Sequence, residues 1–187
     1  MFEPIATTRL VLRPLEQRDR ARLIKLANNW RVAKNLSTMP YPYTEQAADE
    51  WLAKQAELWA SGKTVALAIT SEGELIGGCG VGVRDGEDWE LGYWLGEPYW
   101  NRGYASEAAT ALRDYAFEGL KLDRIVAGHY ADNHASGRIL TKLGFRYTKE
   151  AARYCMARGA EVKCLEMALT QARWREVASG NVEEYAA

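Results

Sequence analysis

The spacing of hydrophobic residues along the chain predicts helices and strands in a mixed order. Apolar residues at helical spacing predict helices over residues 16–36, 45–61, 104–120 and 135–143. Short apolar or alternating runs predict strands over residues 10–14, 65–70, 75–84, 89–95, 124–130, 145–148 and 162–170. Turn-forming pairs, Glu72-Gly73 and Asp85-Gly86, separate the second, third and fourth strands, which favours an antiparallel meander. This order predicts an α+β or mixed α/β fold, with helices on both faces of a sheet.

The composition is that of a folded domain with no excess of either charge. The 187 residues are 48% hydrophobic and 26% charged, enough for one sizeable core, and the formal net charge is −1. This balance excludes the basic excess that drives nonspecific binding to nucleic acids or anionic membranes. An anionic ligand must therefore be held by a few local donors.

Targeting signals and metal motifs are absent from the sequence. No apolar run approaches the roughly 18 residues of a membrane span, and the first ten residues lack the apolar segment of a secretory signal. The three cysteines are widely spaced and form neither a disulfide framework nor a Cys-x-x-Cys metal site. We expect a cytoplasmic protein with no metal, no nucleic-acid partner and no membrane partner.

The segment over residues 97–108 carries the sharpest chemical signal. A strand ends near Leu95, a loop bounded by proline and glycine follows, and an amphipathic helix begins at about Tyr104. The first turn of a helix offers unpaired N–H groups and the positive end of the helix dipole, which together bind anions. Gly103 lets the backbone approach an anion closely, and Arg102 can add a charge-assisted contact. The segment therefore predicts a pyrophosphate site.

Two better-known phosphate loops do not fit the sequence. No Gly-Lys-Ser or Gly-Lys-Thr ending is present, which excludes a Walker loop. The run Gly78-Cys79-Gly80-Val81-Gly82 lies inside a predicted strand with no helix after it, unlike the dinucleotide fingerprint. These glycines favour a bulge, or a place where another backbone or a ligand comes close.

Two segments resemble the signatures of the GNAT superfamily of acetyltransferases. The strand Trp89-Glu90-Leu91-Gly92-Tyr93-Trp94-Leu95, followed by Trp100-Asn101-Arg102-Gly103-Tyr104-Ala105, is similar to the acetyl-CoA signature. Asn133-His134-Ala135-Ser136 leading to Leu143-Gly144-Phe145 is similar to the second signature. The branch it most resembles is the RimJ/RimL type, whose named members acetylate N-terminal amines of ribosomal proteins. The resemblance runs from residue 8 to about residue 174 and implies a single domain over residues 1–187, with a C-terminal tail over residues 175–187.

The resemblance implies a fold, a cosubstrate and a set of binding residues. The fold is a mixed, mostly antiparallel sheet whose fourth strand splays from the fifth, and the cosubstrate is acetyl-CoA. The pantetheine arm would pair with the main chain of Tyr93, Trp94 and Leu95 like an added strand. Asn133 would contact the pantetheine or thioester region, and Ser136 would lie near the sulfur. The residues implied at the pyrophosphate are Asn101, Arg102, Gly103, Tyr104, Ala105 and Ser106.

Two positions depart from the superfamily pattern. Trp100 stands where the phosphate loop usually opens with Gln or Arg, a departure common in the RimJ/RimL-like branch. Leu140 stands where many members place the tyrosine that acts as general acid. Ser136 is then the nearest candidate to protonate the departing thiolate.

Glu90 and His129 are the candidate bases. Glu90 is the acidic residue within its strand, and it resembles the strand glutamate that other members use, often through water, to deprotonate the amine. Strand alternation equally allows Glu90 to be a solvent-facing residue. We expect His129 to be a histidine that is hydrogen-bonded within the sheet, because no catalytic partner accompanies it in the sequence.

The resemblance implies direct transfer of acetyl to a primary amine, by a monomer or homodimer. The proline-held loop over residues 39–43, with Tyr41 and Tyr43, and the join over residues 153–161 are expected to flank the acceptor. A protein N-terminus, an aminoglycoside, a polyamine or another small amine all remain open, with a tilt toward α-amines or small amines over lysines. Another acyl donor, such as succinyl-CoA, is one alternative. A noncatalytic acyl-CoA-binding or interaction module on the same fold is the other, and Leu140 is its best support.

Overall fold

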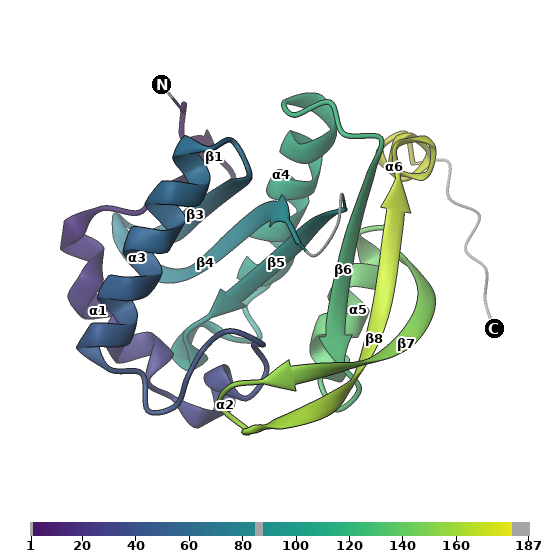
Figure 1. Cartoon of the computed structure of the whole chain (residues 1–187). Coiled ribbons are helices and arrows are strands. Elements are labelled where there is room, and N and C mark those ends of the chain that lie inside the picture. Colours follow the sequence, from purple (N-terminus) through teal and green to yellow (C-terminus); the bar gives the residue numbers. More distant parts are fainter. Residues whose placement is uncertain (1, 85–87, 181–187) are drawn as a thin grey trace.

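One sheet runs through the whole molecule (Figure 1). Its strands follow the order β1-β2-β3-β4-β5-β6-β8-β7, and every neighbouring pair is antiparallel except β5 and β6. The computed structural model describes residues 2–84 and 88–180, so the turn predicted at Asp85-Gly86 lies outside the described residues. The strands are β1 (Ile5–Ala6), β2 (Val11–Pro14), β3 (Thr64–Ser71), β4 (Glu74–Val83), β5 (Trp89–Leu95), β6 (Arg124–Tyr130), β7 (Arg146–Cys155) and β8 (Ala160–Thr170).

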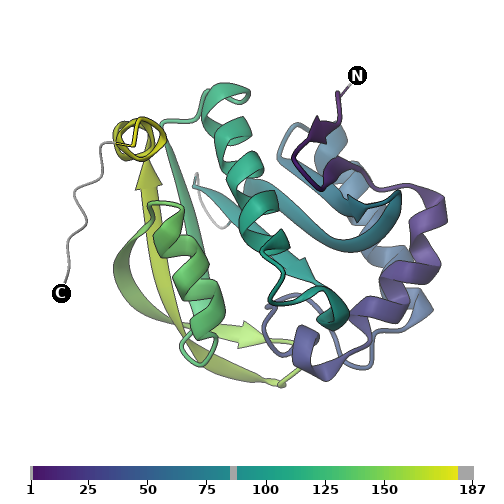
Figure 2. The same cartoon turned by 180° about the vertical axis from the view of Figure 1, so that it is seen from behind.

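Helices cover both faces of the sheet, as the element order predicted (Figures 1 and 2). On one face, α1 and α3 pack with the short α2 over a cluster that includes Leu23, Tyr43 and Leu75. On the other face, α4 and α5 cover a larger cluster that includes Leu112 and Leu140. The helices are α1 (Arg20–Ala27), α2 (Trp30–Ala33), α3 (Glu45–Ala60), α4 (Tyr104–Glu118), α5 (His134–Lys142) and α6 (Gln171–Ala178), with 3₁₀ turns at Gln17–Asp19 and Glu97–Tyr99.

The sheet divides between β5 and β6. Strand β5 pairs with β4 along its whole length, from Trp89 opposite Val83 to Leu95 opposite Gly77. Its parallel pairing with β6 is limited to one residue pair, Glu90 with Val126. Beyond that pair the strands diverge (Figure 1), so no strand of the described residues pairs with the edge of β5 toward Leu95 on this side. The predicted splay is therefore confirmed.

The helix predicted over residues 16–36 is wrong as a single helix. Asn28 ends α1, and Asn29 caps α2 by accepting a hydrogen bond from the Arg31 amide at 2.9 Å. Asparagine side chains bond readily to nearby backbone groups, which favours caps over helix interiors. Because the helix breaks here, Trp30 leaves the apolar stripe and lies 43% exposed against Tyr41.

The C-terminal part holds more regular structure than the sequence predicted. Strand β7 extends far beyond the predicted residues 145–148, and α6 includes residues 175–178 of the expected tail. In α6, Trp174 stacks on Phe117 and its indole donates a hydrogen bond to Asp114 at 2.7 Å. The long β7 was missed because most of its side chains are exposed on an edge strand and carry no apolar alternation.

Close approach of another backbone was one of the two structural roles expected of the glycine run in β4, and a Cβ on Gly80 would lie 3.0 Å from the Val65 carbonyl oxygen of β3. The approach is closest at Gly77, just before that run. A Cβ on Gly77 would lie 2.2 Å from the Trp94 carbonyl oxygen of β5. No side chain fits at that distance, so Gly77 sets how closely β5 approaches β4 at the end that opens from β6.

Replacing Gly77 by Ala should therefore destabilise the protein. We expect Gly77→Ala to lower the free energy of unfolding by about 1–3 kcal/mol, because β5 must shift to admit the methyl group. Gly92→Ala is the matched control, since nothing lies within 4 Å of a Cβ at Gly92 in the neighbouring strand. Urea denaturation of both variants measures the difference, and equal stabilities would show that the contact is readily relieved.

Candidate functional site

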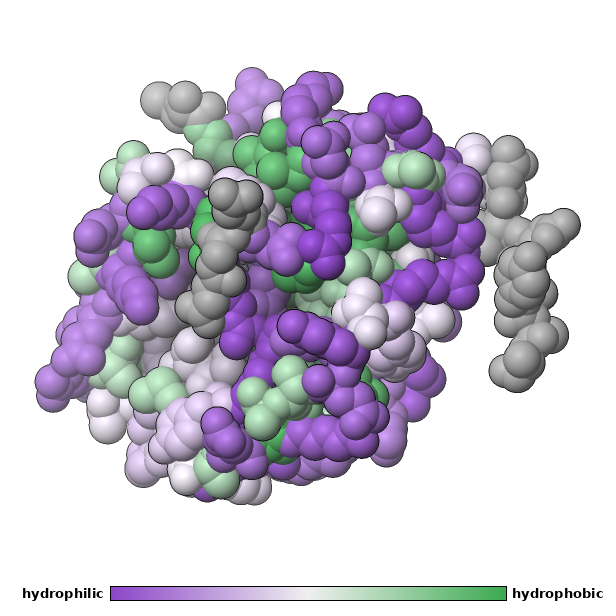
Figure 3. Space-filling model, turned by 45° about the vertical axis from the view of Figure 1, so that its right-hand side comes forward, coloured by the Kyte–Doolittle hydropathy of each residue, from purple (hydrophilic) through white to green (hydrophobic). Residues whose placement is uncertain are grey.

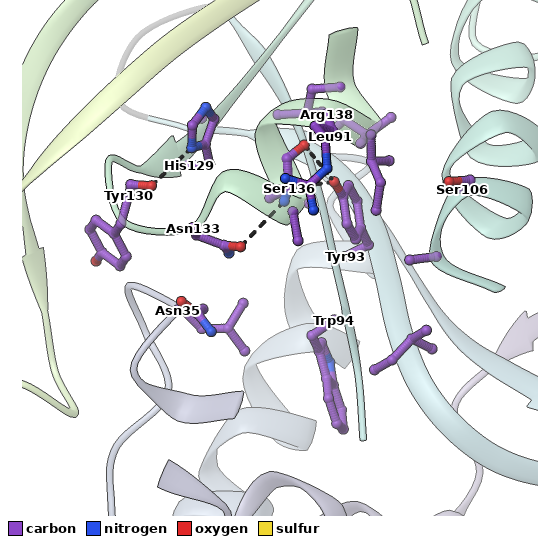
Figure 4. Close-up of a pocket in the computed structure, with 18 of the residues that line it drawn as sticks. Asn35, Leu91, Tyr93, Trp94, Ser106, His129, Tyr130, Asn133, Ser136 and Arg138 are labelled. Carbon is purple, nitrogen blue, oxygen red and sulfur yellow. Dashed lines mark hydrogen bonds between the residues drawn. The ribbon is translucent and has the colours of Figure 1, made fainter. Parts of the chain in front are cut away.

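The splay of β5 from β6 opens a cleft of about 570 Å³ (Figure 4). Its walls come from β5, β6, the first turn of α4, one side of α5, Arg153 of β7, and residues 32–37 at and after α2. The side of the molecule seen in Figure 3 is mostly hydrophilic, and hydrophobic residues form only small separate areas there. The structure places the following sequence-predicted site residues in the cleft wall: Glu90, Tyr93, Trp94, Leu95, Asn101, Gly103, Tyr104, Ala105, Ser106, Asn133 and Ser136.

A run of backbone amides at the start of α4 has no protein partner. The N–H groups from Asn101 to Ser106 donate to no acceptor among the described residues, and the Glu107 amide is the first to bond, to the Gly103 carbonyl at 3.0 Å. Asn101 and Gly103 have φ angles of 58° and 80°, so the chain turns through the left-handed region twice before the helix. Such alternation makes a concave array of donors, which is a common anion site.

Gly103 serves this loop through its backbone angle. Its φ of 80° lies in the region that only glycine adopts readily. A Cβ there would point toward Arg9, 3.2 Å from Nη2. The structure thus adds a conformational reason for glycine at this position, and the close approach of an anion stays a prediction.

Arg9 and Glu107 brace the loop. Arg9 donates to the Arg102 carbonyl at 2.8 Å and to Glu107 Oε2 at 2.7 Å, and its guanidinium lies 4.6 Å from the ring centre of Tyr104. Thr7 Oγ1 donates to the other Glu107 oxygen at 2.7 Å. Burial alone would raise the pKa of Glu107, but these hydrogen bonds outweigh it and hold that pKa below its ordinary value. Sequence reasoning missed this role of Arg9, because its partner is about a hundred residues away.

Trp100 closes the end of β5. Its indole N–H donates to the Leu95 carbonyl at 2.8 Å, and the Arg31 guanidinium lies 5.5 Å from its ring. The side chain is thus used within the fold, although Trp100 still borders the cleft. Arg102 was predicted to contact the anion, but its side chain is not part of the cleft wall.

Ser136 and Asn133 lie together at the start of α5. The Asn133 side-chain oxygen caps the helix by accepting from the Ser136 amide at 3.3 Å. Ser136 Oγ lies 3.0 Å from the Tyr93 hydroxyl, which reaches across from β5 (Figure 4). Burial raises the pKa of Tyr93 to about 12, against an opposing hydrogen bond with Ser136. Leu140, one turn further along α5, is 1% exposed in the core.

Glu90 is held by two arginines at the apex of the cleft. Arg153 Nη1 donates to one carboxylate oxygen at 2.5 Å and Arg84 Nη1 donates to the other at 2.6 Å. Arg153 also donates to Glu166 of β8 at 2.9 Å. Burial lowers the pKa of Arg153, but the bonds to Glu90 and Glu166 more than compensate and leave it raised. Glu90 is therefore not the solvent-facing strand residue that the alternation of β5 also allowed.

The structure does not bring Tyr41 and Tyr43 into the cleft. Tyr43 is 3% exposed in the cluster under α1 and α3, where burial raises its pKa to about 12. Tyr41 is exposed beside Trp30, outside the cleft wall. Asn35, Leu36 and Ser37 line the cleft instead. Asn35 and Leu36 were missed because the predicted first helix ran through them, and Ser37 directly follows that predicted helix.

His129 is a hydrogen-bonded sheet residue, as the sequence favoured. Its Nδ1 lies 2.9 Å from the Tyr130 carbonyl oxygen and its Nε2 lies 3.1 Å from the Tyr147 hydroxyl. Both ring nitrogens are therefore used within the protein, although the residue borders the cleft.

Basic side chains outnumber acidic ones in the cleft wall. Arg138, Lys142 and Arg153 face a single carboxylate, Glu90. Arg138 and Lys142 form no ion pair or side-chain hydrogen bond with another described residue, so their charges remain available to a ligand. This local excess contrasts with the near-neutral chain and favours an anionic guest.

The described residues contain neither a membrane-spanning helix nor a cluster of metal-binding side chains. Over residues 2–84 and 88–180, no helix combines the length and apolar character needed to cross a membrane. Within the same ranges, no group of three or more His, Cys, Asp or Glu side chains is arranged to hold a metal ion.

Known proteins resemble the chain over most of its length. Residues 9–146 match the acetyltransferase (GNAT) domain family. An uncharacterized N-acetyltransferase, p20 of Bacillus licheniformis, is 32% identical over 148 residues, which cover 78% of this chain and 83% of that protein. The structure of Mycobacterium smegmatis RimJ in complex with CoA-disulfide superposes with a TM-score of 0.76 at 26% identity, covering 91% of this chain and 89% of that one. RimL, a ribosomal L7/L12 alpha-N-protein acetyltransferase, has the same fold, with a TM-score of 0.80 at 20% identity over 90% of this chain and 98% of its own.

Removing the Glu107 charge should weaken the fold in a pH-dependent way. Because the pKa of Glu107 is lowered in the folded state, its carboxylate stabilises the fold above the ordinary value of 4.5 and loses this effect as pH falls through the lowered pKa. We expect Glu107→Gln to lower the free energy of unfolding by about 1–2 kcal/mol at pH 7, and the gap to narrow below pH 4.5. Thermal or urea unfolding between pH 3 and pH 8 measures this gap.

Glu150→Gln is the matched control for that series. Glu150 pairs with Lys163 at 2.8 Å, but the two side chains are 65% and 56% exposed. Such a pair contributes little in water, so this variant should follow the wild type at every pH. If the free energy of unfolding of Glu107→Gln also follows that of the wild type at every pH, the hydrogen bonds of Arg9 and Thr7 to Glu107 do not stabilise the loop.

Proposed function

Since the chain belongs to the GNAT acetyltransferase family, we propose that it transfers acetyl from acetyl-CoA to the α-amine of a protein N-terminus or of a small molecule. The observation that carries this proposal is the run of unpaired amides from Asn101 to Ser106 beside the free edge of β5. One end of the cleft thus suits a pyrophosphate, and its wall suits an extended chain of amides.

The residues of the cleft fit the parts of acetyl-CoA. The α4 amides and the helix dipole can hold the pyrophosphate, and the basic side chains Arg138 and Lys142 add positive charge on the α5 side. The Leu95 carbonyl already accepts from the Trp100 indole, but the other free main-chain groups of β5 from Tyr93 to Leu95 can pair with the two amides of pantetheine, because no described strand occupies that edge. The side-chain nitrogen of Asn133 forms no hydrogen bond with another described residue, so it is free to contact the same arm.

The acceptor amine must reach the thioester carbonyl as the neutral base. At pH 7.5, presenting a neutral α-amine with a pKa near 8 costs about 0.5–1 kcal/mol, whereas a lysine with a pKa near 10.4 costs about 4 kcal/mol. Glu90, the candidate base, does not act on protons alone, because each of its carboxylate oxygens also accepts a hydrogen bond from an arginine. This arrangement favours α-amines, in keeping with the RimJ/RimL-type resemblance of the sequence.

Glu90 and Ser136 are assigned the proton-handling roles. An ionised carboxylate can accept about four hydrogen bonds, and the two arginines use one site on each oxygen. Glu90 can therefore still accept the amine proton through a water molecule. Ser136, on the α5 side of the cleft, donates a hydrogen bond to the sulfur as the C–S bond breaks. The acyl group is acetyl in this proposal, and a panel of acyl-CoA donors, including succinyl-CoA, tests that choice.

Acetyl-CoA should stabilise the wild type and not a variant with a disrupted amide loop. We expect stabilisation of about 2.7 kcal/mol at one hundred times the dissociation constant, and much smaller shifts with ATP or NAD. Gly103→Val should abolish the acetyl-CoA shift, because valine does not tolerate the φ of 80° and crowds Arg9. Thermal melts with and without ligand measure the effect.

Gly62→Val provides the matched control for backbone strain. Gly62 has a φ of 69° and nothing within 4 Å of its Cβ position, and it lies between α3 and β3, away from the cleft. This variant should melt lower yet keep the ligand shift. An undiminished shift in Gly103→Val would remove the central claim.

Glu90→Gln should slow turnover in a pH-dependent way. If Glu90 takes the amine proton, kcat should fall by about 10²–10⁴ while the affinity for acetyl-CoA barely changes. Raising the pH should partly restore kcat, because solution chemistry then supplies the neutral amine. Steady-state kinetics between pH 6 and pH 9.5, with an N-terminal peptide and a small-amine panel as acceptors, measure both effects.

Glu166→Gln separates proton transfer from the holding of Arg153. Glu166 also binds Arg153 but lies outside the cleft wall, so its loss should leave the pH profile close to wild type. If Glu90→Gln and Glu166→Gln lower kcat equally, and high pH restores neither, the role of Glu90 is to position Arg153 instead.

A further inference from the structure

We propose that Tyr93 is a positioning residue for the acid step, acting through Ser136. Its phenol donates to Ser136 Oγ and leaves the serine hydrogen free to point at the departing sulfur. This inference rests on the proposed acetyl transfer and adds a side chain from β5 to a step so far assigned to α5 alone.

The geometry joins two rigid elements across the cleft. Tyr93 Oη lies 3.0 Å from Ser136 Oγ and 3.4 Å from the Ser136 carbonyl oxygen. Figure 4 shows the two side chains pointing toward each other from opposite walls. The Tyr93 ring packs against the main core cluster, and Ser136 is fixed in the first turn of a capped helix. Neither group therefore depends on a mobile loop for its position.

The direction of the hydrogen bond follows from the available acceptors. Tyr93 has one proton, and the serine oxygen is its nearer acceptor, since the carbonyl lies at the outer limit of a hydrogen bond. A thiolate forming near Ser136 attracts the serine hydrogen and selects the arrangement in which Tyr93 donates. The chain of donors then runs from Tyr93 to Ser136 to sulfur, and such chains strengthen one another.

The chemistry balances without a change in either side chain. The amine nitrogen forms its bond to the acetyl carbon and loses its proton through a water molecule to Glu90, which later releases it to solvent. The C–S bond breaks with its electron pair on sulfur, which is stabilised by the Ser136 hydrogen and then takes a proton from water. Burial raises the pKa of Tyr93 to about 12, so the phenol stays a donor over the working pH range.

Leu140 explains why a second element is needed. It lies one turn after Ser136 on α5 and is fully buried, and the hydroxyl of the next residue, Thr141, already donates to the Gly137 carbonyl at 2.9 Å. In this chain the phenol instead comes from the neighbouring strand and reaches the same place from the other side of the cleft.

Tyr93→Phe tests the inference, because it removes one oxygen and keeps the ring. We expect kcat to fall about tenfold, the size of one lost hydrogen bond of roughly 1.4 kcal/mol, with the acceptor KM and the acetyl-CoA dissociation constant within twofold of wild type. Tyr147→Phe is the matched control, since it removes a tyrosine hydroxyl bond to His129 from outside the cleft wall and should keep full kcat.

The double variant decides whether Tyr93 acts through Ser136. Ser136→Ala should lose at least as much kcat as Tyr93→Phe, and Tyr93→Phe with Ser136→Ala should be no slower than Ser136→Ala alone. Losses that multiply, a wild-type kcat in either single variant, or a loss of acetyl-CoA binding in Tyr93→Phe would each overturn the inference. A wild type that binds acetyl-CoA but acetylates no amine would instead overturn the proposed function itself.

Discussion

Arg153 joins the two halves of the sheet at the point where they part. Strands β5 and β6 share one residue pair, Glu90 with Val126, and the Arg153 side chain reaches from β7 to bond both Glu90 and Glu166. Gly128 leaves the space that the guanidinium fills, since a Cβ there would lie 3.2 Å from Arg153 Cζ. Breaking a largely buried ion pair by removing one partner is costly, because the other charge stays buried. The width of the cleft therefore depends on this bridge, and Glu90 combines a structural role with its proposed chemical one.

A second constraint acts at the far end of the cleft, where the loop before α4 must keep its conformation although its backbone amides have no protein acceptor among the described residues. Unpaired buried amides cost stability, but Asn101 and residues 103–106 border an open cleft, so water can satisfy their amides when no ligand is bound. The left-handed angles at Asn101 and Gly103 hold the donors on one concave side. Arg9 and Glu107 tie this loop to the first strands of the sheet, so the anion site is built before any anion binds.

Local patterns predicted the parts of this site that are made by one segment. The strand, loop and helix over residues 89–108 follow from residue spacing, proline and glycine, and the structure places them as expected. Parts made by distant segments could not be predicted in the same way. The pairing of Arg9 with Glu107 and the position of Arg153 depend on tertiary packing, and the sequence gives no local sign of either. The loop with Tyr41 and Tyr43 was assigned to the acceptor from its composition, yet burial of Tyr43 in the core decides its place.

Strand alternation arranges the proposed chemistry on two sides of β5. Glu90 and Trp94 share one face of the strand, and Trp94 packs against the cluster under α1 and α3. Tyr93 lies on the opposite face, where it meets Ser136 of α5. In acyl transfer the amine adds on one side of the carbonyl carbon while the thiolate leaves from another. Glu90 and Tyr93 are three residues apart, so their side chains lie on opposite sides of β5. The strand can therefore present the Glu90 carboxylate to the attacking amine and the Tyr93 and Ser136 hydroxyls to the departing thiolate. In the proposed function the free edge of β5 would fix the thioester between them, so the same strand would bind the cosubstrate and set the directions of attack and departure.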